Sequence, residues 1–282
     1  MLLNKLLLIA KVSRPRFWLY LAGPYLLGTV AFSTHERSLT EWVLLFYGFI
    51  FFLIPANILL YGLNDYFDFD TDQFNKKKTD KESLLSGASN RILVSRLVGF
   101  SFILSLPLFY YLDFYGRALL GLFLFLSFSY SALPLRFKSK VILDSLSNIL
   151  YVLPGLIAYV FTFPVFPSIQ IILAGFLWAI AMHLFSAIPD IAPDKKAGIQ
   201  TSAVFFGKEK SLFICSVIWS LVGICLLPNM VFFFVGLLYA SIPLVLLIRG
   251  ASSYELEKTY WRFPYINGLV GFLVFVYIYF VV

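Results

Sequence analysis

Apolar runs long enough to cross a membrane recur along the whole sequence. A helix needs about 20 apolar residues to span the hydrocarbon layer of a bilayer. Only 13% of the residues are charged, against about 25% in an average soluble domain. We therefore predict an all-α membrane protein with nine transmembrane helices, forming a single domain over residues 1–282. The nine runs, read between charged stretches, are residues 15–33, 42–64, 92–112, 117–134, 143–163, 168–189, 211–227, 229–248 and 263–281.

The basic residues are divided unequally between the two sides of the predicted membrane. If the N-terminus is cytoplasmic, all of the 22 Lys and Arg residues except Arg37 and Arg117 lie on the cytoplasmic side. This orientation satisfies the positive-inside rule and, with nine spans, leaves the C-terminus outside. The net charge of +7 then reflects topology, and we infer no nucleic-acid partner. We expect a multi-pass protein of the cytoplasmic membrane, with residues 1–11 as an amphipathic segment on its inner surface.

Carboxylates cluster where the second predicted span ends, in the sequence NDYFDFDTD of residues 64–72. If this span continues as a helix, Asn64, Asp68 and Asp72 lie on one face, with Asp65 beside them. Clustered carboxylates repel one another, so such a face favours bound cations. Oxygen ligands of this kind suit Mg²⁺ together with substrate phosphates. The simpler interpretation is a solvated helix end, but these acids stand where basic residues usually anchor the membrane boundary.

A second pair of carboxylates, Asp190 and Asp194, ends the sixth predicted span. Their spacing places both on one side of a helix, although Pro189 and Pro193 could distort the turn. Two groups of acids at the same membrane depth could hold Mg²⁺ ions that bridge a diphosphate and neutralise it as a leaving group. The active site would then face the cytoplasm. The predicted metal ligands are Asn64, Asp68, Asp72, Asp190 and Asp194.

Basic residues near both motifs are candidates for direct contact with a diphosphate. Lys77 follows the first motif, Lys195 follows the second, and Arg16 stands at the start of the first span. For a single lysine, the positive-inside role is the favoured account. Arg136 and Lys138 lie beyond the fourth span, and an arginine there suits bidentate recognition of phosphate oxygens. The predicted catalytic residues are Asp68, Asp190, Arg136 and Lys138.

Three polar residues in or beside the apolar runs are further candidates, and two of them, His183 and Asp144, have two open interpretations each. His183 precedes Asp190 by seven residues and lies on nearly the same helical face. It could accept a proton from a product cation, but a structural hydrogen bond is the favoured role. Asn148 and Asp144 open the fifth span and could support a cavity, while helix capping is the simpler account of Asp144.

Taken together, these motifs resemble the UbiA superfamily of membrane prenyltransferases. The family pattern Asn-x-x-x-Asp-x-x-x-Asp fits residues 64–72, and its later Asp-x-x-x-Asp pattern fits residues 190–194. The resemblance implies nine helices around a central cavity, with Mg²⁺ and a prenyl diphosphate at both motifs. It also implies that Tyr130, Arg136 and Lys138 contact the donor. The predicted substrate-binding residues are Asn64, Asp65, Tyr130, Lys77, Lys195, Arg16, His183 and Asn148.

Three stretches, residues 13–18, 144–148 and 183–190, look closest to the lycopene elongase branch. That resemblance implies a dimethylallyl or longer diphosphate as donor and a lipophilic acceptor from the bilayer, such as lycopene. Two departures, Leu133 where related proteins more often have proline and the Lys76–Lys78 run, leave the carboxylates untouched.

Other functions remain open at this point. The acceptor could instead be an aromatic quinone precursor or another lipid, and the enzyme could merely hydrolyse isoprenoid diphosphates. A divalent-cation transporter is a further alternative, because acids within the membrane often mark ion paths. Transport sites tend to lie near the bilayer midplane, whereas these acids lie at the ends of the predicted spans.

Overall fold

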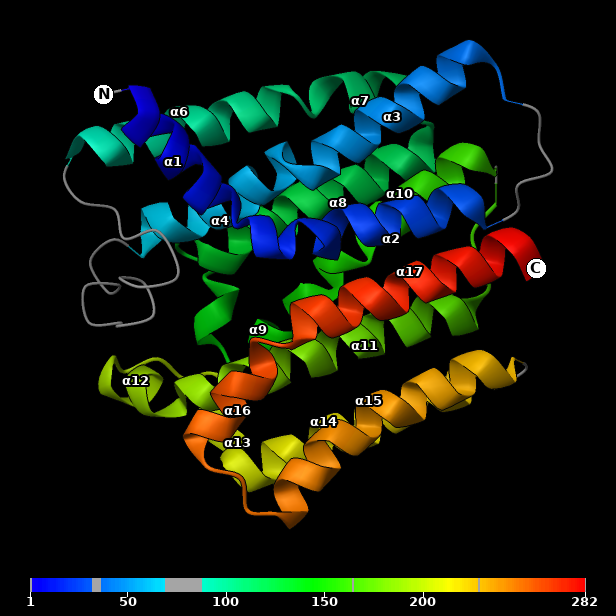
Figure 1. Ribbon diagram of the computed structural model, residues 1–282. Helices are drawn as coiled ribbons and strands as arrows, with labels where there is room; N and C mark the ends of the chain where they lie inside the picture. Colours follow the sequence, from blue (N-terminus) through cyan, green and yellow to red (C-terminus); the bar gives the residue numbers. More distant parts are fainter. Residues whose placement is uncertain (1, 32–36, 69–87, 164, 228, 282) are drawn as a thin grey trace. The chain divides into compact units, whose positions relative to one another are not determined.

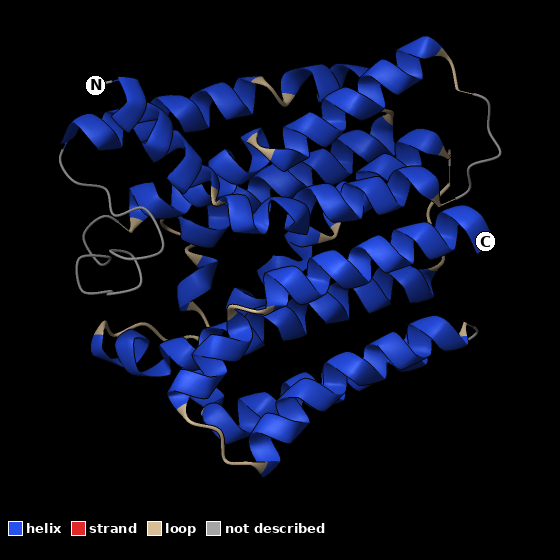
Figure 2. Cartoon of the chain, viewed as in Figure 1, coloured by secondary structure: helices blue, strands red, loops and turns tan. Residues whose placement is uncertain are grey.

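The computed structural model describes residues 2–31, 37–68, 88–163, 165–227 and 229–281. All regular structure within these ranges is helical, and they contain no strand (Figures 1 and 2). The prediction of an all-α fold is therefore confirmed. Contacts between residues divide the chain into two compact units, which we call the first unit and the second unit.

The first unit comprises Met1–Leu135, Leu153–Phe166 and Pro264–Val282. Its helices are α1 (Leu2–Ser13), η1 (Pro15–Phe17), α2 (Trp18–Val30), α3 (Leu39–Leu53), α4 (Pro55–Phe67), α6 (Ala88–Ile103), α7 (Leu106–Tyr111), α8 (Phe114–Ser131), α10 (Leu153–Thr162) and nearly all of α17 (Phe263–Val281).

The second unit comprises Arg136–Val152 and Pro167–Phe263. Its helices are η3 (Phe137–Ser139), α9 (Leu143–Leu146), η4 (Ser147–Tyr151), α11 (Ile169–Ala187), η5 (Ile188–Asp190), α12 (Ile191–Lys196), α13 (Ser202–Phe206), α14 (Lys208–Cys225), α15 (Met230–Ile248) and α16 (Ser253–Tyr260).

Seven helical stretches among the described residues are long and apolar enough to cross a membrane. Each coincides with one of the nine predicted spans. Helices α2 and α14 stand at the places of the other two, but α2 has only 13 residues and α14 begins with the charged sequence KEK. Nine spans and the orientation of the termini stay predictions. The seven stretches are Leu39–Phe67, Ser89–Tyr111, Phe114–Ser131, Leu143–Thr162, Ile169–Lys196, Met230–Ile248 and Ser253–Val281.

A proline interrupts the helical path that leads to the first carboxylate motif. Pro55 begins α4, and because proline has no backbone N–H it cannot continue the hydrogen-bond ladder of α3. The Asn57 side chain compensates, since its Nδ2 donates to the carbonyl oxygens of Phe52 and Leu53 at 3.0 Å each. Asn57 is fully buried. The break therefore leaves these two carbonyls satisfied within an apolar interior.

The N-terminal helix packs against the helix that carries the first motif. Val12 of α1, Ile58 of α4 and Val94 of α6 form one buried cluster, with Leu8 and Ile9 against it. The segment predicted to be amphipathic is helical over residues 2–11, and its place on the membrane surface stays a prediction. This packing fixes the end of α1 beside α4.

Close backbone approaches and aromatic packing stabilise the two units. In the first unit, a Cβ on Gly28 of α2 would come within 2.1 Å of the Gly155 carbonyl oxygen of α10, so only glycine fits there. In the second unit, Trp219 stacks on Phe263 at a centroid distance of 5.7 Å, and Phe185 meets Phe263 edge-on at 5.0 Å. Each unit therefore has a core of its own.

Candidate active site

The first carboxylate motif lies at the C-terminal end of α4. The helix ends at Phe67, and Asp68 follows it as the cap, with its backbone N–H donating to the Asn64 carbonyl at 3.0 Å. Asp68 is 7% exposed. Asp72 and Lys77 lie outside the described residues, so the predictions about them stay predictions. The i to i−4 hydrogen bond still places Asp68 one turn from Asn64, as the spacing predicts.

A serine from another helix holds the Asn64 side chain. Ser131, the last residue of α8, donates from Oγ to Asn64 Oδ1 at 3.1 Å. Tyr130, predicted to bind substrate, is the preceding residue and is half-buried. The C-terminal ends of α4 and α8 therefore meet, and the amide oxygen of Asn64 has a fixed orientation.

Asp65 forms a buried ion pair with Arg14, which lies between α1 and η1. Arg14 Nη2 donates to Asp65 Oδ1 at 3.0 Å, and the side chains are only 11% and 1% exposed. The Arg14 guanidinium also lies 4.4 Å from the ring centroid of Tyr61. Arg14 has a φ of 49°, which turns the chain sharply between α1 and η1. Arg16 is exposed on η1.

The second carboxylate motif follows α11. Pro189 converts the helix into the 3₁₀ turn η5, which ends at Asp190, and α12 resumes directly with Asp194 in its first turn. The expected distortion by proline is thus confirmed. Both carboxylates are half-buried, and Thr201 Oγ1 donates to Asp194 Oδ2 at 3.4 Å. Lys195 is exposed on α12.

The predicted basic residues Arg136 and Lys138 lie at the short helix η3, Arg136 immediately before it and Lys138 within it. Arg136 precedes it with a φ of 38°, and its carbonyl accepts from Ser139 Oγ at 2.9 Å. Both basic side chains are half-buried. The segment they form lies in the second unit, as do Asp190 and Asp194.

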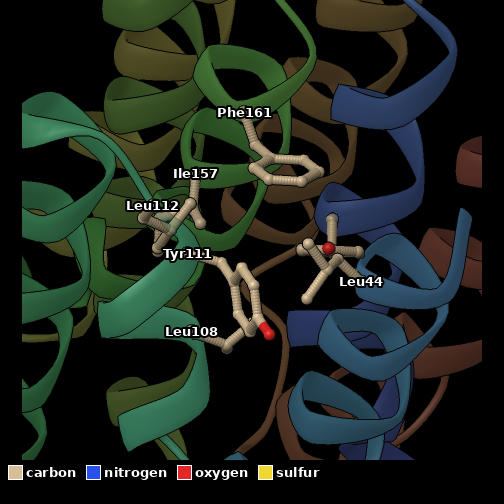
Figure 3. A pocket seen from close by; sticks show the side chains of 7 residues that line it. Leu44, Leu108, Tyr111, Leu112, Ile157 and Phe161 are labelled. Atoms are coloured by element: carbon tan, nitrogen blue, oxygen red, sulfur yellow. The ribbon is translucent and has the colours of Figure 1, made fainter. Parts of the chain in front are cut away.

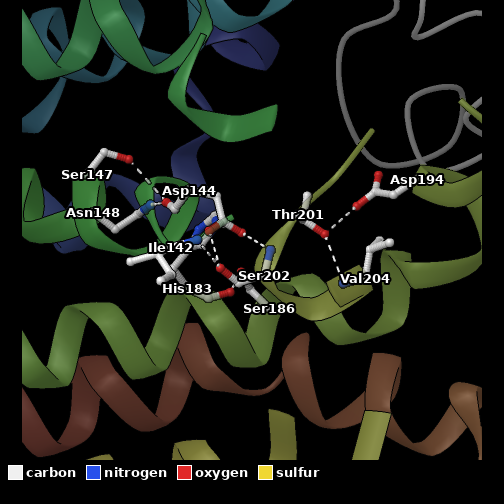
Figure 4. Close-up of polar contacts among 10 residues, drawn as sticks. All are labelled: Ile142, Asp144, Ser147, Asn148, His183, Ser186, Asp194, Thr201, Ser202 and Val204. Atoms are coloured by element: carbon white, nitrogen blue, oxygen red, sulfur yellow. Dashed lines mark hydrogen bonds and ion pairs between the residues drawn. The ribbon is translucent and has the colours of Figure 1, made fainter. Parts of the chain in front are cut away.

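Asp144 does not cap its own helix, so the capping account is wrong. Its carboxylate accepts from Ser202 N at 2.7 Å and from Ser202 Oγ at 2.5 Å (Figure 4). His183 Nε2 lies 3.9 Å from Asp144 Oδ2, and Asn148 Nδ2 donates to the Asp144 carbonyl at 2.6 Å. His183 and Asn148 therefore both lie beside Asp144 in the second unit.

The donor set of the two motifs is chemically suited to Mg²⁺. The first motif offers the amide oxygen of Asn64 and the carboxylate of Asp68, and the second motif by itself offers the carboxylates of Asp190 and Asp194. Hard divalent cations prefer such oxygen ligands. Within either described unit, no three His, Cys, Asp or Glu side chains gather closely enough to hold a metal by themselves. A substrate phosphate would complete such a set, as is usual for Mg²⁺.

A separate apolar pocket lies in the first unit (Figure 3). Its lining includes Tyr25 of α2, Leu44 of α3 and Ile157 of α10, and it has no carboxylate or basic side chain. A pocket without cations or metal ligands offers nothing to a diphosphate, so the candidate site remains with the carboxylate motifs.

Comparison with known proteins decides the family. Residues 21–269 match the UbiA prenyltransferase family. The chain belongs to this family. It is a membrane prenyltransferase and crosses the membrane several times, which sets aside the transporter alternative.

Several UbiA relatives match almost the whole chain. A lycopene elongase/hydratase of Haloferax volcanii is 40% identical over 273 residues, covering 96% of this chain and 88% of that protein. One from Halobacterium salinarum is 41% identical over 264 residues, 92% of each chain. Another from Corynebacterium glutamicum is 31% identical over 237 residues, covering 81% of this chain and 80% of its own.

Solved structures share the fold. A UbiA homolog from Archaeoglobus fulgidus bound to DMAPP and Mg²⁺ superposes with a TM-score of 0.67 at 19% identity, covering 98% of this chain and all of that one. A structure of digeranylgeranylglyceryl phosphate synthase has a TM-score of 0.68 at 19% identity, covering 97% and 98%. The chain therefore has the UbiA fold.

Four residues contact the carboxylate motifs or Asp144, and the sequence did not predict these contacts. Arg14 pairs with Asp65 across 51 positions and Ser131 bonds Asn64 across 67. Thr201 contacts Asp194, and Ser202 holds Asp144. Serine and threonine are common at helix ends for local reasons, so nothing in the sequence distinguishes these from ordinary caps.

Proposed function

We propose that this protein transfers a prenyl group from an allylic diphosphate to a carotenoid acceptor such as lycopene, with Mg²⁺ as cofactor. The observation that carries the proposal is the 40% identity to a lycopene elongase/hydratase over nearly the full length of both chains. We further propose that the two units form one prenyltransferase domain over residues 1–282, embedded in the cytoplasmic membrane with its active site toward the cytoplasm.

The donor diphosphate would bind at the two carboxylate motifs. Mg²⁺, when bound, neutralises the charge of the diphosphate and makes it a better leaving group. The chemistry of the ligands supports this assignment, and so does the Mg²⁺ in the homologous Archaeoglobus structure. Asp68 and Asp190 are the ligands we expect to be indispensable. The proposed ligands are Asn64, Asp68, Asp72, Asp190 and Asp194.

The basic residues would hold the diphosphate oxygens as it leaves. Arg136 offers a planar fork of N–H donors that matches two phosphate oxygens, and Lys138 adds a point charge on the same segment. Arg136 and Lys138 are therefore the basic residues that we propose to be catalytic. The remaining proposed substrate-binding residues are Asn64, Asp65, Tyr130, Lys77, Lys195, Arg16, His183 and Asn148.

The transfer breaks one bond and forms another. The C–O bond between the allylic carbon and the diphosphate breaks, and its electron pair leaves with the diphosphate. The allylic carbon then bonds to the terminal double bond of the acceptor, which becomes a cation. Loss of a proton or uptake of water ends the reaction. Exclusion of bulk water until that step protects the reactive cation.

The acceptor can be tested in a lycopene-producing bacterial strain. Expression of this protein, followed by mass spectrometry of the extracted pigments, should yield new species heavier than lycopene by five or ten carbons. The same strain expressing Asp190→Ala at equal abundance serves as the control and should retain lycopene unchanged. Unchanged lycopene in the strain with the wild-type protein would contradict a carotenoid acceptor and favour a quinone-type or other lipid acceptor.

A further inference from the structure

The carboxylate of Asp144 connects two segments that are far apart in the sequence. It is completely buried, so it cannot touch a substrate. One oxygen accepts from the backbone N–H of Ser202 and the other from its hydroxyl, at 2.7 and 2.5 Å (Figure 4). Hydrogen bonds to an ionised group are stronger than those between neutral groups. Two such bonds to one residue make a firm connection across 58 positions.

Ser202 extends this connection to a strained turn. Its Oγ accepts from the backbone N–H of Ile142 at 2.7 Å, while it donates to Asp144. Ile142 has a φ of +71°, a conformation that a β-branched residue rarely adopts. Such a residue keeps its conformation only where the surroundings hold it. The Ser202 hydroxyl holds this turn through the Ile142 amide, together with the hydrogen bond from the Asp144 backbone N–H to the Lys140 carbonyl at 2.9 Å.

The segments on either side of the connection carry proposed diphosphate-binding residues. The turn at Ile142 directly follows the segment with Arg136 and Lys138. On the other side, Thr201 immediately precedes Ser202 and donates to Asp194 Oδ2 at 3.4 Å. All of these residues belong to the second unit, so the contacts lie within one compact body.

We propose that Asp144 and Ser202 are positioning residues for the donor diphosphate. Together they join the Arg136–Lys138 segment to the Thr201 turn beside Asp194, and so fix the separation between the basic residues and the second carboxylate motif. This inference rests on the proposed function. His183 Nε2 of α11 lies 3.9 Å from Asp144 Oδ2, and the Asn148 side chain of η4 donates to the Asp144 backbone carbonyl.

The connection can be measured without any substrate. Hydrogen–deuterium exchange of the purified protein in detergent follows the peptides that span residues 136–143. Asp144→Asn and Ser202→Ala should each speed exchange there about tenfold, because each removes a hydrogen bond to a charged group. Ser220→Ala is the matched control, since it removes a serine bond of similar length inside α14, from Ser220 Oγ to the Ser216 carbonyl.

Kinetics with dimethylallyl diphosphate and lycopene test what the connection is for. Each variant should raise the KM for the donor about tenfold while kcat at saturating donor changes less than about threefold. The double variant should be no worse than the more impaired single variant, because both substitutions break one connection. Ser220→Ala should match the wild type, and Ser202→Ala supplies the answer if Asp144→Asn fails to fold.

Two results would overturn the inference. Exchange at residues 136–143 as slow in both variants as in the wild type would refute the connection. Faster exchange with an unchanged donor KM would refute its role in positioning. Failure of the proposed function is seen separately, as a wild-type protein that transfers nothing to lycopene. In that case the exchange data still decide on the connection, and equilibrium binding of dimethylallyl diphosphate replaces KM.

Discussion

The two units hold their buried aspartates by different chemistry. In the first unit, Asp65 is paired with a cation, the guanidinium of Arg14 at 3.0 Å. In the second unit, Asp144 accepts from the backbone and hydroxyl of Ser202, with His183 3.9 Å away. A full opposite charge compensates a buried acid far more strongly than neutral dipoles do, but its loss leaves more charge uncompensated. The first unit should therefore be the more sensitive to losing a partner.

Burial also differs between these two acids and the proposed metal ligands of the second unit. Asp65 and Asp144 are each almost completely buried and directed toward a protein partner. Asp190 and Asp194 are half-buried at the end of α11 and in α12. In the second unit, exposure therefore distinguishes the supporting acid Asp144 from the proposed ligands Asp190 and Asp194. In the first unit the proposed ligand Asp68 is itself only 7% exposed, so burial alone does not assign its role.

The largest effect should come from removing one proposed ligand in either unit. Asp68→Ala and Asp190→Ala should each lower prenyl transfer by more than about 100-fold, because each removes a metal ligand for which water is a poor substitute. Turnover of dimethylallyl diphosphate by purified protein measures this loss. Glu209→Gln, at a 70% exposed acid on α14, is the control and should keep full activity. Wild-type turnover by only one of the two alanine variants would show that the units do not contribute equally.

A smaller effect, on the free energy of unfolding, distinguishes the ion pair of Asp65 from the hydrogen bonds of Asp144. Arg14→Ala should lower the free energy of unfolding by about 3 kcal/mol, because it leaves the Asp65 carboxylate buried without its cation. Ser202→Ala should cost less, about 2 kcal/mol, because it removes one hydrogen bond to the Asp144 carboxylate and the hydroxyl acceptor of the Ile142 amide. Denaturant unfolding in detergent compares them. Adding Asp65→Asn to Arg14→Ala should restore part of the loss, and equal losses for Arg14→Ala and Ser202→Ala would break the comparison.

The smallest effect concerns the orientation of Asn64. Ser131→Ala removes its 3.1 Å hydrogen bond to Asn64 Oδ1, worth about 1 kcal/mol, and should raise the donor KM about fivefold. Ser127→Ala, one turn earlier on α8, removes only a bond to the Phe123 carbonyl of the same helix and should leave KM unchanged. An equal rise in KM for both serine variants would mean that the Asn64 contact has no special role.

The sequence predicts what depends on local pattern. Apolar runs locate the helices, and four-residue spacing places Asp68 one turn from Asn64 and Asp194 next to Asp190 in the following turn. Pro189 predicts a distorted turn, observed as the 3₁₀ turn η5, because proline lacks the N–H that an α-helix needs. These features follow from a few neighbouring residues, so a single sequence is enough to find them.

What the sequence misses depends on tertiary contacts. From the sequence, Asp144 is interpreted as a helix cap because the nearest unsatisfied N–H groups are those of the helix that it begins. Its partner in the structure is Ser202, 58 positions away. Arg14 reads as one of many basic residues on the cytoplasmic side, and only folding brings it to Asp65. Such pairings are set by which helices pack together, and helical periodicity carries no information about that.

Metal-dependent binding of the donor tests the central claim most directly. Calorimetric titration of the purified protein with dimethylallyl diphosphate should show tight binding in Mg²⁺, and affinity should fall by more than about 100-fold in excess EDTA and recover on adding Mg²⁺ back. Asp68→Ala and Asp190→Ala should each bind as weakly in Mg²⁺ as the wild type does in EDTA. Equal wild-type affinity with and without Mg²⁺ would contradict the claim that carboxylates of both units bind the diphosphate through the metal.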